Sequence, residues 1–227
     1  MNADPKAPHG LYDLNNPQDW PALRKKMRGT AYHEAGHFAA LLFTDLELPN
    51  VVDISIIPED GSIGHMSYER HWTYAVAGVR SYPPPLQRML GIIKLIEKLA
   101  GVGTEMILDQ SNEWGGIFDY WTWRDDDYEE HPDFSVAFSI AEIMAHPYVS
   151  VYRILNLADK WTLEMLRIPA VWKAVETIAG KLLEQGQITN MKGELSAMAD
   201  KYCSDVPKFY NLPKWKRRIS LKQSWLD

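Results

Sequence analysis

The segment His-Glu-Ala-Gly-His at 33–37 constrains the fold more than any other part of this chain, because it lies in a stretch that reads as continuous helix. Residues four apart on a helix lie on the same face, so His33 and His37 can direct two imidazole nitrogens at one point. That arrangement suits a zinc ion. Glu34 projects about 100° around the helix from His33, where it can reach a water on the metal. The motif therefore predicts two zinc ligands and a general base, as in a zinc peptidase.

Histidines at this spacing also occur in helices where they serve packing or surface charge. In this helix, small residues recur along one side and several other residues are bulky and apolar. This pattern predicts a buried helix. The small residues are Ala31, Ala35, Ala39 and Ala40, and the bulky ones are Phe38, Leu41, Leu42 and Phe43. Two buried histidines need a polar partner, so we favour the metal site.

Length and charge narrow the class of protein. The 227 residues, 46% of them hydrophobic, suffice to bury a full core. The net charge of −6 gives no electrostatic reason to bind nucleic acid. The longest apolar run, 38–43, is far shorter than the ~20 residues that span a bilayer. These features predict a chain with neither a nucleic-acid partner nor a membrane span.

The start of the chain and its cysteine content bear on localisation. Residues 1–18 lack the basic start and apolar centre of a signal peptide. Cys203 is the single cysteine, which excludes an internal disulfide and fits a reducing compartment. We expect a cytoplasmic protein.

Helix and turn signals predict a mainly α fold with a small β-hairpin or sheet next to the His-Glu-Ala-Gly-His helix. The hairpin is expected from two β-branched runs, 51–58 and 62–68, around a turn that contains Gly61. Residues 110–131, rich in Trp, Asp and Glu, predict a long loop that is either a lid or a partner contact. The expected helices cover 19–45, 86–108, 133–145, 148–166, 169–185 and 188–202. The expected divisions are an irregular lead-in at 1–16, a peptidase domain at 17–202 and a tail at 203–227.

A catalytic zinc ion needs a third protein ligand from outside the motif. Glu105 is one candidate, with Asp109 four residues later as a carboxylate that could orient it. Asp133 is the other, in the first turn of the helix after the aromatic and acidic loop. A helix-start role also explains Asp133, because the helix dipole favours a carboxylate there. Spacing alone leaves both candidates open.

Four segments, in order, resemble the peptidase domain of the FtsH family of ATP-dependent zinc proteases. They are AYHEAGHFAALLF, VVDISIIPEDGSIGHMSYE, LAGVGTEMIL and PDFSVAFSIAEIM, and the similarity spans residues 19–200. The resemblance implies a zincin-like helical peptidase domain. It also implies His33, His37 and Asp133 as zinc ligands, Glu34 as the base, and a supporting role for Glu105.

The chain departs from that family in several respects. We expect no ATPase module or membrane anchor, and the Gly-Gly-Arg element of the family reads Gly101-Val102-Gly103. The aromatic and acidic loop replaces a Thr-Gly-rich segment before the aspartate. We therefore expect a stand-alone domain that cuts peptides or unfolded proteins, unless an ATPase partner acts in trans. Peptidase domains of the family form six-membered rings, which makes a homo-oligomer one option.

Two functions follow as expectations. The first is a zinc-dependent metalloendopeptidase that hydrolyses peptide bonds through a metal-activated water, with the substrate held on the strand near Gly64. His65 on that strand would be either an oxyanion donor or an ordinary strand histidine. The second is a catalytically silent zinc-binding regulatory or interaction module derived from such a peptidase. In that case the loop at 110–131 would fill the cleft or receive a partner.

Overall fold

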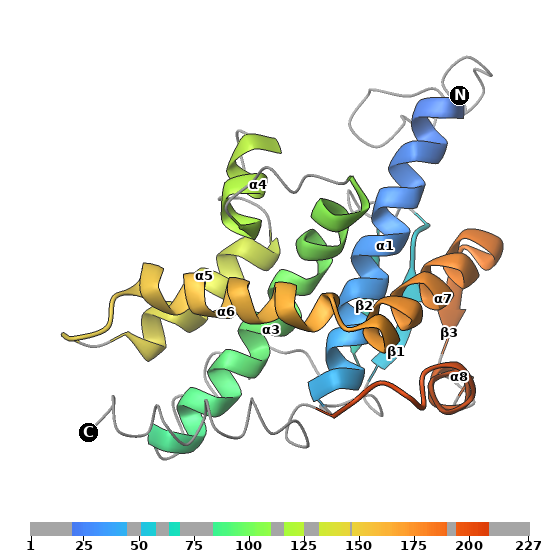
Figure 1. Cartoon of the computed structure of the whole chain (residues 1–227). Coiled ribbons are helices and arrows are strands. Elements are labelled where there is room, and N and C mark those ends of the chain that lie inside the picture. The colour runs from blue at the N-terminus through green and yellow to red at the C-terminus, as the bar shows by residue number, and fades with distance from the viewer. Residues whose placement is uncertain are drawn as a thin grey trace, which may run out of the picture.

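Helices dominate the structure, and one small antiparallel sheet lies beside them (Figure 1). The computed structural model describes residues 20–44, 51–57, 64–68, 84–109, 116–124, 132–145, 147–189 and 194–208. The helices are α1 (Trp20–Thr44), α3 (Pro84–Leu108), α4 (Ile117–Arg124), α5 (Pro132–Met144), α6 (Val151–Leu166), α7 (Pro169–Gln185) and α8 (Glu194–Tyr202). The strands are β1 (Val51–Ser55), β2 (His65–Tyr68) and β3 (Gln187–Thr189). The predicted mainly α fold with a small sheet is confirmed.

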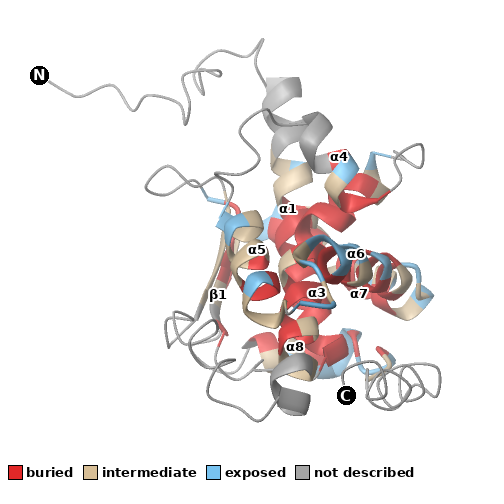
Figure 2. Ribbon diagram, turned by 90° about the vertical axis from the view of Figure 1, so that its left-hand side faces the viewer, coloured by how far each residue is buried: buried red, intermediate tan, exposed pale blue. Residues whose placement is uncertain are grey.

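Helix α3 joins the two halves of the core, because α1, α5 and α6 all pack against it. Its residues Ile96 and Ala100 belong to the cluster formed with α1, the sheet and α7. Its residues Leu95 and Leu99 belong to a second cluster with α4, α5 and α6. Figure 2 shows the buried residues concentrated on α1, α3, α6 and α7. Helix α3 therefore fixes where α1 stands relative to α5.

The helices α1 and α3 cross closely because small residues meet at the crossing. A Cβ atom added to Gly36 would lie 2.5 Å from the backbone oxygen of Ala100. The hydroxyl of Thr104 donates to the backbone oxygen of Tyr32 at 2.8 Å across the same crossing. This contact brings the histidine-bearing face of α1 against α3.

The sheet has the order β2-β1-β3, with β1 antiparallel to both neighbours. The predicted pairing of the runs at 51–58 and 62–68 is confirmed, although the turn at 58–63 lies outside the described residues. Ile54 stands opposite both Met66 and Ile188, and these apolar side chains face the core. The sheet thus buries one face, as its alternating pattern requires.

Strand β3 was not predicted, since its residues fall at the start of the helix expected at 188–202. The chain leaves α7 at Gly186, which adopts a φ of 77° that favours glycine. The backbone N–H of Ile56 then donates to the oxygen of Gly186 at 2.9 Å, and the chain continues alongside β1. Pairing with β1 overrides the helical spacing, and α8 begins only at Glu194.

The prediction of a continuous loop at 110–131 is wrong where α4 forms. The side chains of Ile117 and Tyr120 in this helix are fully buried. Asp159 of α6 accepts a hydrogen bond from the Ile117 backbone N–H at 3.0 Å, and so satisfies a donor at the start of the helix. The hydroxyl of Tyr120 donates to Asp109 at 2.7 Å. These contacts are long-range, which is why a sequence pattern did not reveal the helix.

The described residues that follow α8 pack against the core. Cys203 and Val206 are buried, and the ammonium group of Lys208 donates to the Leu42 backbone oxygen at 2.9 Å near the end of α1. The predicted lead-in at 1–16 and most of the predicted tail lie outside the described residues. None of the helices in the described part of the chain has the length and apolar character needed to cross a membrane.

Candidate metal centre

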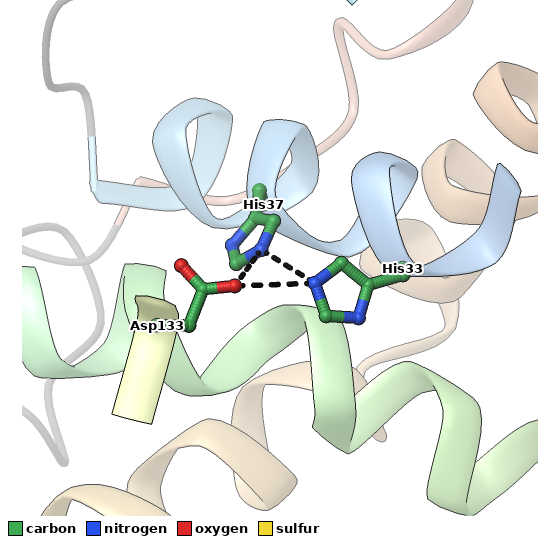
Figure 3. Close-up of side chains that lie close together, drawn as sticks. All are labelled: His33, His37 and Asp133. Atoms are coloured by element: carbon green, nitrogen blue, oxygen red, sulfur yellow. Dashed lines mark hydrogen bonds and ion pairs between the residues drawn. The ribbon is translucent and has the colours of Figure 1, made fainter. Parts of the chain in front are cut away.

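Three side chains from two helices converge at one point (Figure 3). His33 and His37 come from α1 and Asp133 comes from the first turn of α5. The Nε2 atoms of the histidines lie 3.0 Å apart, and Asp133 Oδ2 lies 3.2 Å from His33 Nε2 and 3.1 Å from His37 Nε2. Within the described residues, these three form the group that could hold a metal ion.

The outer nitrogens of both rings are occupied by acceptors on α3. His37 Nδ1 lies 2.7 Å from the Glu97 backbone oxygen, which can only accept, so this nitrogen carries the proton. His33 Nδ1 lies 2.8 Å from Glu105 Oε1, and there too the ring nitrogen donates to an oxygen. In the neutral rings both Nε2 atoms then present lone pairs to each other and to the Asp133 carboxylate. Lone pairs this close repel one another unless a proton or a metal ion lies between them.

The spacing of the three donors fits a small ion. A tetrahedral zinc site with bonds of about 2.0–2.1 Å has donor atoms about 3.3 Å apart, so the observed triangle needs to widen by only a few tenths of an ångström. Room for the ion comes from Gly101 on α3. A Cβ atom there would lie 2.6 Å from the Nε2 atoms of both histidines. Gly101 thus lies directly beside the inner nitrogens of both histidines.

Charged side chains of α3 support the aspartate. The ammonium group of Lys98 donates to Asp133 Oδ1 at 3.2 Å and lies 3.3 Å from Glu97 Oε1. Lys94 lies 3.4 Å from the other oxygen of Glu97. Three carboxyl groups and two ammonium groups therefore lie around the triangle. With Asp133 they carry a formal charge of −2 when every group is ionised, which is opposite in sign to the charge of a metal ion. They are Glu34, Glu97, Glu105, Lys94 and Lys98.

Burial and these charges set the protonation of the site. Burial raises the pKa of Asp133, but His37 and Lys98 outweigh it and hold the pKa well below its usual range. Burial likewise opposes ionisation of Glu97, yet Lys98 and Lys94 lower its pKa to about 2. Both groups are therefore carboxylates at neutral pH. An ionised Asp133 is the form that can bind a metal.

Glu34 is buried beside the triangle and faces the start of β2. Burial raises its pKa, and the nearby His33, His37 and Lys98 partly oppose that rise. A Cβ atom added to Gly64 would lie 3.2 Å from Glu34 Oε1, so the backbone before β2 passes close to this carboxyl group. A raised pKa brings a carboxylate nearer to the range useful for proton transfer at neutral pH.

The other predicted site residues have different partners. Glu105 contacts the outer nitrogen of His33, whereas Asp133 contacts the two inner nitrogens, so the structure places Asp133 in the triangle. Asp109 accepts from Tyr120 rather than orienting Glu105. The imidazole of His65 lies 3.5 Å from Asp53 on the sheet, which fits an ordinary strand histidine.

Sequence reasoning missed Lys98 and Glu97. A signal was present, because both charged residues stand in an otherwise apolar part of α3 with Lys94 one turn before. Charged groups at buried positions need partners, and their partners here are one another and Asp133.

A scan against known protein families and a search of curated proteins found no match for this chain. The resemblance to the FtsH peptidase domain therefore stays a prediction, and the site stands on its own geometry.

Proposed function

We propose that this chain is a zinc-dependent metalloendopeptidase with a zincin-like domain of the FtsH peptidase type. The observation that carries the proposal is the triangle of two imidazole nitrogens and one carboxylate oxygen, next to a buried Glu34. His33, His37 and Asp133 would hold the zinc ion. Zinc bound there supplies Lewis acidity, which polarises a carbonyl and makes water a stronger acid.

In the proposed reaction Glu34 makes both proton transfers, and other residues orient the histidines. Glu34 takes a proton from the attacking water as the water oxygen bonds to the scissile carbonyl carbon. It then gives that proton to the amine nitrogen as the carbon–nitrogen bond breaks, so the carboxylate is regenerated. Glu105 and the Glu97 backbone oxygen hold the two histidines in the tautomer that presents Nε2.

The substrate is proposed to be an extended peptide or an unfolded protein segment. Among the described strands, β2 lies at the edge of the sheet, and no described strand pairs with its outer side, where a peptide strand is proposed to add. Gly64, which precedes β2, lies next to Glu34. A peptide paired with β2 would therefore run past the proposed base. The proposed substrates are flexible, so a folded protein would be cut only if an ATPase unfolded it first.

Glu34→Gln tests the proposal because glutamine keeps the shape of the side chain but cannot accept the proton. We expect zinc binding to persist and hydrolysis of fluorescein-labelled casein to fall at least about 100-fold. Glu142→Gln is the matched control, because Glu142 is exposed on α5, the helix that also carries Asp133. This control should cleave at the native rate.

The same assay separates the alternatives. A Glu34→Gln variant as active as the native chain would rule out this mechanism. Zinc binding by the native chain without any cleavage would instead favour the silent binding module. Deleting residues 110–131 is a poorer test, because it removes the buried Ile117 and Tyr120 from the core.

A further inference from the structure

The two oxygens of Asp133 have different surroundings. Oδ2 lies within 3.2 Å of the Nε2 atoms of both His33 and His37, where a metal would bind. Oδ1 points to the ammonium group of Lys98, which donates to it at 3.2 Å. Oδ2 therefore faces the proposed ion, and Oδ1 accepts a hydrogen bond from the Lys98 ammonium group.

We propose that Lys98 is a positioning residue that keeps Asp133 a one-oxygen ligand and thereby favours zinc over ions that take more oxygen ligands. The proposal rests on the metal centre proposed above. An unrestrained carboxylate can bind a metal through both oxygens, whereas zinc sites of this kind use few ligands and keep a position for water. Manganese prefers six mostly oxygen ligands, so it gains most when the second oxygen is released.

The position of Lys98 is itself fixed by Glu97. The Glu97 side chain is almost fully buried, and its two oxygens lie 3.3 Å from Lys98 and 3.4 Å from Lys94. The backbone oxygen of the same residue accepts from His37 Nδ1. One turn of α3 thus orients a histidine ligand through its backbone and the carboxylate ligand through Lys98. Such outer contacts affect metal binding strongly.

Lys98→Met and its control Lys94→Met test this role. Both changes remove one ammonium group from Glu97, but only the first also releases Asp133 Oδ1. The measured quantity is the ratio of the dissociation constants for manganese and zinc, from competition with a chelating dye. Each variant removes one positive charge from the protein. Because both ions are divalent, this charge change alters both dissociation constants similarly and largely cancels in their ratio.

We expect Lys98→Met to lower that ratio roughly tenfold and Lys94→Met to leave it unchanged. With cobalt in place of zinc, Lys98→Met should weaken the visible absorption bands, since added ligands make the coordination more nearly octahedral. Lys98→Arg keeps a cationic donor and should restore the native ratio and spectrum. An unchanged ratio in Lys98→Met, or an equal change in Lys94→Met, would refute the role of Lys98.

Zinc-edge X-ray absorption of the native, zinc-loaded chain adds a measurement that needs no variant. We expect four ligands at about 2.0–2.1 Å. A carbon shell at the short distance typical of a chelating carboxylate would contradict a one-oxygen aspartate even if every variant failed to fold. Should the native chain bind no zinc, the metal centre itself would be wrong, whereas zinc binding with an unaltered ratio would refute only this inference.

Discussion

A Cβ atom added to Gly101 would lie 2.6 Å from the Nε2 atoms of both His33 and His37. That point is close to where an ion shared by the two nitrogens has to sit. We therefore expect Gly101→Ala to weaken zinc binding at least about 100-fold, because the methyl group excludes the ion and pushes the rings apart. Competition with a chelating dye measures the affinity, and circular dichroism reports whether the helices persist.

Gly29→Ala is the matched control for that variant. Gly29 lies in α1, the helix that carries both histidines, and a Cβ atom there would meet nothing within 4 Å. Alanine is the better helix former, so this variant should bind zinc like the native chain and gain about 0.5–1 kcal/mol of stability. Zinc affinity of the Gly101→Ala variant equal to that of the control would show that the ion lies elsewhere.

At the scale of elements, α4 depends on a carboxyl group of another helix. Asp159 of α6 accepts from the Ile117 N–H, while its Oδ1 is buried without a hydrogen-bond partner among the described residues. Burial raises the pKa of Asp159 to about 6, although the Ile117 and Phe118 N–H groups oppose that rise. Since the ordinary value is 3.8, the folded protein binds this proton more tightly than the unfolded chain does.

The sign of the pH effect follows from that difference. The contribution of Asp159 to stability is fully present below pH 3.8 and is lost as the pH rises through about 6. Asp159→Asn mimics the protonated form at every pH. We expect the native chain to lose about 2 kcal/mol of stability relative to this variant between pH 4 and pH 8. Urea unfolding at both pH values measures it, and an equal difference at both would contradict the raised pKa.

At the scale of the whole molecule, the proposed ion links α1 to α5, two helices that are otherwise joined through α3. An ion that binds only the folded chain stabilises it in proportion to the logarithm of its concentration over Kd. When the free ion concentration is 1,000 times Kd, the free energy of unfolding rises by about 4 kcal/mol. This corresponds to a rise in Tm of roughly 10 °C for a chain of this size.

Thermal unfolding with zinc and with a chelator tests this link. We expect the rise in the native chain and in Glu142→Gln, an exposed change on α5, and none in Asp133→Asn. A similar rise in Asp133→Asn would mean that zinc binds without this carboxylate.

Local patterns were sufficient to predict much of this protein. The spacing of four residues placed His33 and His37 on one face of a helix. The small and apolar residues around them in the same helix predicted that it is buried. The helix expected at 169–185 matches α7, which begins at Pro169 and is followed by the cap residue Gly186. These features depend on residues close together in the chain, where backbone geometry fixes which side chains meet.

Only the tertiary structure shows which distant groups lie against the two histidines. Helix α3 places Glu105 against the outer nitrogen of His33, whereas α5 places Asp133 against the inner nitrogens of both histidines. The tertiary structure also revealed Lys98 as the partner of Asp133 and formed β3 and α4 through long-range contacts. The physical reason is that a carboxylate 100 residues from its histidine has no periodicity to reveal it, and its position follows from how the helices pack on α3.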